Sequence, residues 1–272
     1  MSKFQIGVQI YSVRDEAGKD FAGTLKALKE MGYDGGELAG TYGLSAAEIR
    51  KAADEAGIDL FSAHVPLGDL RSDPERTVAL YKEIGCRWIV VPYLMPEDRP
   101  QAGHFEKTIA DLKAISEECR RQGICLCYHN HDFEFFRMPD GRYALDVLYE
   151  SLPAENLQTE LDTCWVHVAG VDPADYVRKY AGRAPLVHLK DYDGEKSEDM
   201  YALIGIDRKP DPNAKPFDFR PVGSGKMPIK EVIRAAEDAG TVWLIVEQDE
   251  PAKGENRMDS VRKSADYLKT VL

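Results

Sequence analysis

The segment 124-ICLCYHNHDFEFF-136 places an apolar run directly before two histidines, an asparagine, an aspartate and a glutamate. Its apolar part is typical of a buried strand, whereas histidine and carboxylate side chains are the usual groups that bind metals and transfer protons. A strand that ends in this way would deliver several such groups to one edge of a sheet. The same combination returns at the ends of other apolar runs in the chain.

Most apolar runs of the chain end in polar or ionisable side chains. In chain order these are Gln9 and Tyr11, Glu37, His64, Tyr93, His129 with Asn130 and His131, Glu160 and Asp162, His188 with Lys190 and Asp191, and Glu247 with Gln248. One histidine at a strand end is more often a hydrogen-bonded structural residue than a ligand. A lone acidic residue there often caps the following helix. Neither explanation accounts well for many such groups at once.

The apolar runs alternate with amphipathic segments of helical periodicity. Strands are predicted at 4–12, 33–38, 58–65, 87–94, 124–130, 156–162, 184–191 and 241–248. Helices are predicted at 20–32, 45–57, 73–85, 103–122, 143–152, 173–182, 228–240 and 256–271. This alternation predicts a parallel sheet, and eight such units predict an α/β fold, the (β/α)8 TIM barrel, as one domain over residues 1–272. An open doubly wound sheet is the alternative, but residues 1–30 lack its glycine-rich dinucleotide fingerprint.

A parallel barrel brings the carboxyl ends of its strands to one rim, where the active sites of such barrels lie. The fifth to eighth predicted strands would each deliver a carboxylate or an imidazole to that rim. Buried carboxylates at one rim repel each other, and a divalent cation would remove this cost. Carboxylates with one or two imidazoles suit Mn²⁺, Co²⁺, Mg²⁺ or Zn²⁺. The sequence therefore predicts a metal site.

The composition disfavours several kinds of partner. Lys and Arg number 35 against 47 Asp and Glu, so the net charge is −12, and such a surface repels nucleic acid and anionic membranes. The five cysteines form no CxxC pair. The first residues lack the apolar core of a signal peptide, and no run approaches the roughly 18 apolar residues of a membrane span. We therefore expect a reduced, cytoplasmic protein with neither a nucleic-acid nor a membrane partner.

Several motifs together resemble one known family. They are IGVQIYSVRDE (6–16), SAHVPL (62–67), HNHDFEF (129–135), ELDTCWVHVAGVDP (160–173), LVHLKD (186–191) and IVEQDE (245–250). The set resembles the sugar phosphate isomerase/epimerase family, which belongs to the xylose isomerase-like TIM barrel superfamily, over nearly the whole chain. This resemblance implies a divalent metal at the C-terminal rim, held by Glu, Asp, His and Glu from successive strands.

The resemblance assigns three metal ligands directly: Asp162, His188 and Glu247. Ketose 3-epimerases of this family carry the remaining glutamate within the fifth strand, where this chain has Tyr128 or His129. Glu134, just past that strand, is the expected replacement, and His129 is the alternative. The chain therefore departs from the pattern of a simple ketose 3-epimerase.

The implied substrate is a sugar, a keto-sugar or a related polyol. Its carbonyl oxygen and a neighbouring hydroxyl would bind the Lewis-acidic metal, so that a base can remove the adjacent C–H proton and leave a metal-stabilised enediolate. Returning the proton to the opposite face epimerises the substrate, returning it to the neighbouring carbon isomerises it, and loss of a β-hydroxyl dehydrates it. Glu134 and Glu247 are expected as acid and base. His131 and Lys190 would polarise substrate oxygens or move protons.

Other rim side chains are expected to contact the substrate. They are Gln9, Glu37, His64, His129 and, by stacking on a sugar face, Trp165. The alternatives are a buried structural role for His64 and simple packing for Trp165. Lys190 should have a lowered pKa beside a metal and His188, unless it forms a salt bridge with Glu160 or Asp162.

Two loops after the seventh strand have candidate roles. The segment 221-PVGSGKMP-228 precedes a helix, so its backbone could hold an anionic or hydroxylated substrate. It lacks the spacing of a P-loop, and a flexible loop is the preferred interpretation. The polar segment 193–220 is predicted as a loop insertion that could cover the mouth of the barrel or form a dimer contact in a homo-oligomer.

Three function classes remain in competition. The leading prediction is a metal-dependent isomerase or epimerase, with a metal-dependent dehydratase (lyase) of inosose or keto-sugar type as the alternative. Apurinic-site endonucleases share the superfamily, but they use three zinc ions and need a basic surface and more ligands than six histidines supply. A non-catalytic sugar-binding barrel would have little use for a costly cluster of like charges.

Overall fold

Eight parallel strands close into a barrel in this computed structural model, which describes residues 4–196 and 217–272. The strands follow one another around the barrel in the order β1-β10-β7-β6-β5-β4-β3-β2. They are β1 (Gln5–Gln9), β2 (Gly35–Ala39), β3 (Asp59–His64), β4 (Trp88–Val91), β5 (Cys125–His129), β6 (Gln158–Asp162), β7 (Leu186–Leu189) and β10 (Trp243–Val246). The prediction of a (β/α)8 TIM barrel is confirmed.

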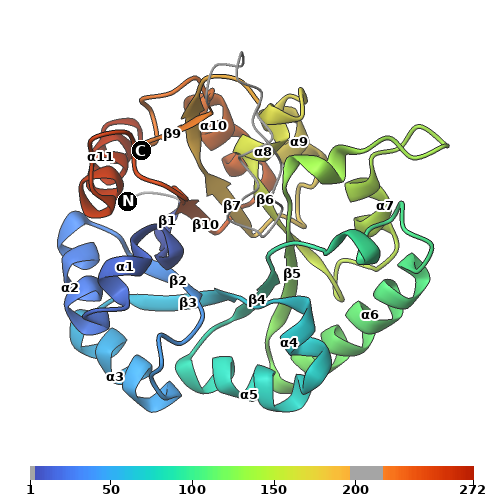
Figure 1. Ribbon diagram of the computed structural model, residues 1–272, viewed down its shortest axis with the longest axis horizontal. Coiled ribbons are helices and arrows are strands. Elements are labelled where there is room, and N and C mark those ends of the chain that lie inside the picture. Colours follow the sequence, from blue (N-terminus) through green and yellow to red (C-terminus); the bar gives the residue numbers. More distant parts are fainter. Residues whose placement is uncertain (1–3, 197–216) are drawn as a thin grey trace.

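Helices surround the strands on the outside of the barrel (Figure 1). The main ones are α2 (Phe21–Met31), α3 (Ala46–Ala56), α5 (Pro74–Ile84), α6 (Phe105–Gln122), α7 (Ala144–Glu150), α9 (Pro173–Lys179), α10 (Ile229–Ala239) and α11 (Arg257–Val271). Short helical turns sit at the strand ends: η1 (Ile10–Val13), α1 (Arg14–Ala17), α4 (Leu67–Ser72), η2 (Pro96–Asp98), η3 (Asp132–Phe135) and α8 (Thr163–Val168). In the part of the chain that the structure describes, no helix is both long and apolar enough to cross a membrane.

Local capping explains where the main helices begin and end. At the start of α3, Ser45 Oγ accepts the N–H of Glu48, and the Glu48 carboxylate accepts the N–H of Ser45 in return. This reciprocal pair satisfies backbone donors that the first turn leaves free. The same helix ends at Gly57, whose φ of 65° lies in the left-handed region that favours glycine. Both ends match the sequence pattern.

The half of the barrel interior nearer the amino ends of the strands, here called the lower half, is filled by apolar side chains. Phe61, Val90, Cys127, Leu186, Trp243 and Ile245 form this inner cluster. The rings of Phe61 and Trp243 stack with centroids 3.8 Å apart. A Cβ atom on Gly35 would lie 2.6 Å from Trp243 Cη2, and one on Gly7 would lie 2.7 Å from Phe61 Cε1. The two glycines therefore make room for the stacked pair.

The predicted strand 184–191 is in fact two short strands. β7 ends at Leu189, and β8 (Asp191–Asp193) pairs antiparallel with β9 (Asp218–Arg220) outside the barrel. The ends of the predicted insertion 193–220 thus belong to a two-stranded sheet. Residues 197–216, to which most of the lid or dimer role was assigned, lie outside the described residues.

Candidate metal centre and active site

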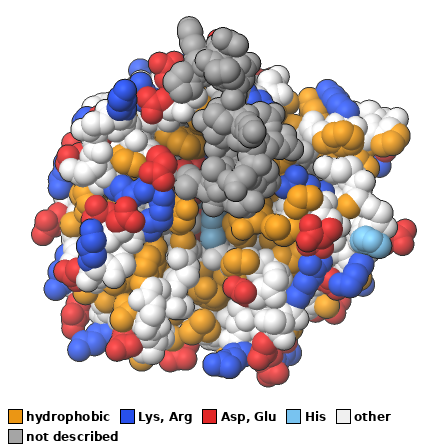
Figure 2. All heavy atoms as spheres, in the orientation of Figure 1, with side chains coloured by type: hydrophobic (Ala, Val, Ile, Leu, Met, Phe, Trp, Pro, Cys, Tyr) orange, Lys and Arg blue, Asp and Glu red, His pale blue; other side chains and the backbone are white. Residues whose placement is uncertain are grey.

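A cavity of about 420 Å³ opens at the carboxyl ends of the strands. Its lining includes six residues expected from the sequence, namely His64, His129, His131, Trp165, Lys190 and Glu247. Tyr11, Tyr93, Asp69 and Asp249 also line it. On the face of the molecule seen in Figure 2, hydrophobic side chains gather around the centre, where a histidine side chain is visible. The location is the one expected for the active site of a TIM barrel.

One group of potential ligands at the cavity comprises His129, Asp162, His188 and Glu247, here called the upper group. Each offers a ligand atom, and these atoms all lie within 4.8 Å of one another. His188 Nδ1 lies 2.9 Å from Glu247 Oε2, and His129 Nε2 lies 3.7 Å from Asp162 Oδ2. All four side chains are buried. Segments far apart in the sequence therefore supply two carboxylates and two imidazoles to one point.

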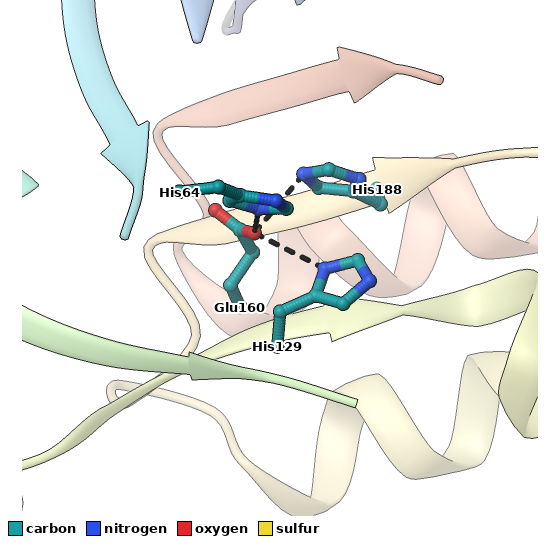
Figure 3. A group of neighbouring side chains, drawn as sticks. All are labelled: His64, His129, Glu160 and His188. Atoms are coloured by element: carbon teal, nitrogen blue, oxygen red, sulfur yellow. Dashed lines mark hydrogen bonds and ion pairs between the residues drawn. The ribbon is translucent and has the colours of Figure 1, made fainter. Parts of the chain in front are cut away.

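A second group, His64, His129, Glu160 and His188, is here called the lower group. Glu160 Oε1 lies 2.7 Å from His64 Nε2 and 3.1 Å from both His129 Nδ1 and His188 Nε2 (Figure 3). A second buried carboxylate joins it, because Glu37 Oε1 lies 2.9 Å from His188 Nε2 and 3.1 Å from His64 Nε2. The two groups share His129 and His188.

Strand register explains why these side chains meet. In the parallel pairs, His129 is the partner of Glu160, and Asp162 is the partner of His188. Side chains two residues apart on a strand point to the same face. Glu160 and Asp162 therefore both face the barrel interior while Leu161 faces outward to the helices. One strand thus supplies a carboxylate to each group.

The charges of the two groups are strongly coupled. Burial alone would raise the pKa of Glu37, but His64 and His188 hold it well below its ordinary value. Burial would lower the pKa of His64, but Glu37 and Glu160 raise it to about 10. Burial raises the pKa of Glu160. Imidazolium and carboxylate therefore stabilise each other in a space without water.

The upper group contains a neutral imidazole and an unsatisfied carboxylate oxygen. Burial lowers the pKa of His129 well below its ordinary value, so its ring is neutral and has a lone pair. Asp162 Oδ1 accepts the N–H groups of Cys164 and Trp165 at the start of α8, whereas Asp162 Oδ2 has no hydrogen-bond donor among the described residues. A buried oxygen without a donor is costly. Two carboxylates and two imidazoles with such an oxygen fit a divalent cation.

Lys190 is buried beside the upper group and makes ion pairs with three carboxylates. Its Nζ lies 3.0 Å from Glu247 Oε2, 3.2 Å from Asp249 Oδ2 and 3.4 Å from Asp162 Oδ2. Burial lowers the pKa of Lys190, but Asp249, Glu247 and Asp162 raise it well above its ordinary value. The salt bridge to Asp162, which was the alternative expected from the sequence, is therefore present.

Glu134 lies apart from both groups. Its carboxylate accepts hydrogen bonds from Tyr128 Oη and, at 2.7 Å, from the backbone N–H of His131. The chain turns into η3 directly after β5, which directs this side chain back onto its own segment. Burial raises the pKa of Glu134 to about 8. The structure thus places His129, the alternative ligand, where Glu134 was expected.

The predicted substrate-contacting residues divide by depth. His64, His129 and Trp165 line the cavity, and the Trp165 ring stacks on His131 with centroids 5.3 Å apart. Gln9 and Glu37 are fully buried, and Gln9 Nε2 donates to Glu37 Oε1 at 2.9 Å. The latter two therefore support the lower group from beneath the cavity.

The loop 221–228 binds a carboxylate of its own chain. Asp191 accepts the backbone N–H groups of Gly223, Gly225 and Met227 at 2.9–3.0 Å. A Cβ atom on Gly225 would lie 2.3 Å from Asp191 Oδ1, so the close approach requires glycine. These backbone donors hold Asp191, and the interpretation of a free substrate-gripping loop does not fit them.

Sequence reasoning missed the roles of Asp249 and Glu160. Asp249 follows Glu247 by two residues and lines the same cavity. Glu160 precedes Asp162 by two residues, and the sequence indicated it only as a strand-end carboxylate and as a possible salt-bridge partner of Lys190. For Glu160, one step back from Asp162 along the two-residue period of β6 points to the residue, whereas Asp249 lies past the end of β10 and is identified only by its contacts in the fold.

Comparisons with known proteins place the chain in a family. The profile of the xylose isomerase-like TIM barrel family matches residues 25–271, and the chain belongs to this family. The resemblance seen in the sequence motifs is therefore confirmed.

Individual relatives are more distant. An inosose dehydratase from Geobacillus kaustophilus (strain HTA426) is 25% identical over 191 residues, which are 61% of this chain and 60% of that protein. Among solved structures, a sugar phosphate isomerase/epimerase from Parabacteroides distasonis ATCC 8503 is 23% identical, with a TM-score of 0.78 and 98% of each chain covered. A D-psicose 3-epimerase is 17% identical, with a TM-score of 0.69 and 99% of each chain covered. These structures share the fold, and the proteins are named as enzymes.

Proposed function

We propose that this protein is a divalent-metal-dependent isomerase or epimerase of a sugar, keto-sugar or related polyol. The observation that carries the proposal is the upper group, whose four ligand atoms lie within 4.8 Å of one another. His129, Asp162, His188 and Glu247 would hold the ion, which is Mn²⁺, Co²⁺, Mg²⁺ or Zn²⁺. Glu134, which was expected as the fourth ligand, is replaced by His129 in this proposal because its carboxylate is bound by Tyr128 and His131.

The bound ion would supply Lewis acidity toward a carbonyl oxygen of the substrate. The chain itself supplies the proton-handling groups. His131 lines the cavity, and burial lowers its pKa well below the ordinary value, so its neutral ring can accept a proton. Lys190, a protonated amine at the cavity wall, can donate a hydrogen bond to a substrate oxygen. Trp165 forms an apolar wall that limits the access of water.

A dehydratase is the second candidate function, and two observations favour it. The Geobacillus kaustophilus relative is an inosose dehydratase. The sequence also departs from the ketose 3-epimerase pattern, because Tyr128 or His129 stands where that pattern has a glutamate within the fifth strand. A dehydratase uses the same first step, removal of a proton next to a carbonyl, followed by loss of a β-hydroxyl.

The test combines solvent isotope exchange with product analysis. Wild-type protein with Mn²⁺ is incubated in deuterated water with ketoses and with an inosose. We expect deuterium at the carbon next to the carbonyl, and the products distinguish epimerisation from loss of water. A substrate that turns over without any exchange would rule out proton abstraction. Asp146→Asn is a control variant that should show the same exchange as the wild type. Asp146 is a buried carboxylate that accepts hydrogen bonds from Tyr176 and Tyr180 and lies outside the site.

A further inference from the structure

His129 and His188 each face both groups with opposite ring nitrogens. His188 directs Nδ1 to Glu247 in the upper group and Nε2 to Glu37 and Glu160 below it. His129 directs Nε2 toward Asp162 above and Nδ1 to Glu160 below. An imidazole that binds a cation has given up one proton, and it then carries one N–H and one lone pair. The partner that accepts the N–H therefore decides which nitrogen remains able to bind a cation.

Glu160 is placed to make that decision for both rings at once. Its Oε1 lies among imidazoles from β3, β5 and β7, as the dashed lines in Figure 3 show. With an ion in the upper group, Glu247 and Asp162 would bind the ion, and Glu160 would be the carboxylate that accepts the remaining hydrogens of His129 Nδ1 and His188 Nε2. The side chain is fully buried, so water does not compete for these contacts.

We infer that Glu160 is a positioning residue that fixes the tautomers of His129 and His188, so that their other nitrogens, Nε2 and Nδ1, are turned to the cation in the upper group. The inference rests on the proposed metal site and adds a residue that contacts two of its ligands without binding the ion itself. Carboxylates that accept the free N–H of a metal-binding histidine orient the ring and increase its basicity.

Glu37 assists Glu160 and is itself held in place. It accepts hydrogen bonds from Gln9 Nε2, at 2.9 Å, and from Ser62 Oγ. Its Oε1 also contacts the same nitrogen of His188 that Glu160 contacts. The proton on His188 Nε2 therefore has two acceptors, which strengthens the assignment of Nδ1 as the nitrogen that faces the ion.

The lower group is the competing position for the ion. There, Glu160 would be a ligand, and His129 Nδ1 and His188 Nε2 would bind the metal. The lining of the cavity favours the upper group. Glu247 lines the cavity through which a substrate would arrive, whereas Glu160 does not line it. The two positions predict opposite metal-bound nitrogens.

Imidazole ¹⁵N NMR of the wild-type protein with Zn²⁺ distinguishes the two positions. We expect His188 to bind Zn²⁺ through Nδ1 and to carry its proton on Nε2. We expect His129 to bind through Nε2 and to carry its proton on Nδ1. The reverse pattern would overturn the inference while leaving a metal site intact, whereas the absence of any Zn²⁺-bound histidine would reject the proposed metal site as well.

The matching variant is Glu160→Gln, which keeps the size of the side chain and removes its charge. Removing such a supporting carboxylate typically weakens metal binding about 10- to 100-fold, and we expect that loss in Mn²⁺ affinity measured by titration calorimetry. Asp146→Asn should bind Mn²⁺ as the wild type does. Unchanged affinity and unchanged metal-bound nitrogens in Glu160→Gln would contradict the inference. If that variant does not fold, the wild-type NMR pattern decides alone.

Discussion

The two halves of the barrel interior are built from the same strands but from opposite kinds of side chain. The lower half holds the inner cluster, in which Phe61 and Trp243 stack at 3.8 Å. The upper half, at the carboxyl ends of the strands, holds the carboxylates and imidazoles of both the upper and the lower group. On three strands the change occurs within one two-residue step: Cys127 to His129, Leu186 to His188 and Ile245 to Glu247.

This change divides the tasks of stability and function along each strand. Apolar burial in the lower half stabilises the fold in proportion to the surface removed from water. Burial of charge in the upper half opposes folding unless every charge is paired. The upper half is tolerated because each of its charged groups has an opposite charge or a hydrogen-bond donor nearby, and a bound cation would add to this balance.

The strongest test of this division of tasks removes a metal ligand from the upper half. Glu247→Gln and Asp162→Asn should each weaken Mn²⁺ binding by more than about 100-fold, because each removes a carboxylate proposed to bind the ion directly. Removing a residue that only supports a ligand typically costs about 10- to 100-fold. Calorimetric titration measures this loss, and urea unfolding should show a less stable fold, because each variant takes one charged partner from the buried Lys190. Wild-type affinity in either variant would remove that residue from the ligand set.

The second test opens a cavity in the lower half. Trp243→Ala should lower the free energy of unfolding by about 3–5 kcal/mol, because a fully buried ring and its stack on Phe61 are lost. Mn²⁺ affinity of the folded variant should stay within about twofold of the wild type. A large loss of affinity with little loss of stability would show that the two halves do not divide these tasks.

Glu134 provides a third test, because it is a buried carboxylate that accepts hydrogen bonds only from uncharged donors. Burial raises its pKa to about 8, whereas in the unfolded chain its pKa is about 4.3. Between these pH values the folded protein keeps a proton that the unfolded chain has lost. This residue therefore makes stability fall as the pH rises, by about 1.4 kcal/mol per pH unit.

Glu134→Gln should flatten that part of the stability–pH profile measured by urea unfolding between pH 5 and pH 8. The variant should also bind Mn²⁺ as tightly as the wild type, since His129 rather than Glu134 is the proposed ligand. A profile identical to the wild type's would show that the Glu134 pKa is not raised. A large loss of Mn²⁺ would restore Glu134 as a ligand.

The smallest expected effect is at the rim outside the barrel. Asp191→Asn should lower the free energy of unfolding by about 1–3 kcal/mol, because an amide leaves some of the N–H donors of the 221–228 loop without an acceptor. Hydrogen exchange at Gly223 and Gly225 should become faster, with Mn²⁺ affinity unchanged. Exchange at the wild-type rate would mean that Asp191 does not hold the loop.

The barrel and half of its site follow from local sequence rules. Ser45, Glu48 and Gly57 mark the ends of α3, and the strand ends Asp162, His188 and Glu247 point inward by the two-residue period. The place of Glu134 does not follow, because past the end of β5 the period no longer applies and the side chain binds Tyr128 and the N–H of His131 instead.

The depth and charge of a site residue also lie beyond the strand pattern. Gln9 ends β1 as expected, whereas Glu37 lies in the middle of β2, and both lie beneath the cavity and support other side chains. The pKa of Lys190 depends on Asp249, which follows β10, the neighbour of β7 in the barrel but far from it in the sequence. Such properties arise from contacts between segments far apart in the sequence.

The position of the ion can be read directly from anomalous X-ray diffraction of crystals grown with Zn²⁺. We predict one strong peak at about 2.0–2.2 Å from Asp162, His188 Nδ1, Glu247 and His129 Nε2. A peak centred on Glu160, a peak bound to Glu134, or no peak at the carboxyl ends of the strands would contradict the upper group as the metal centre.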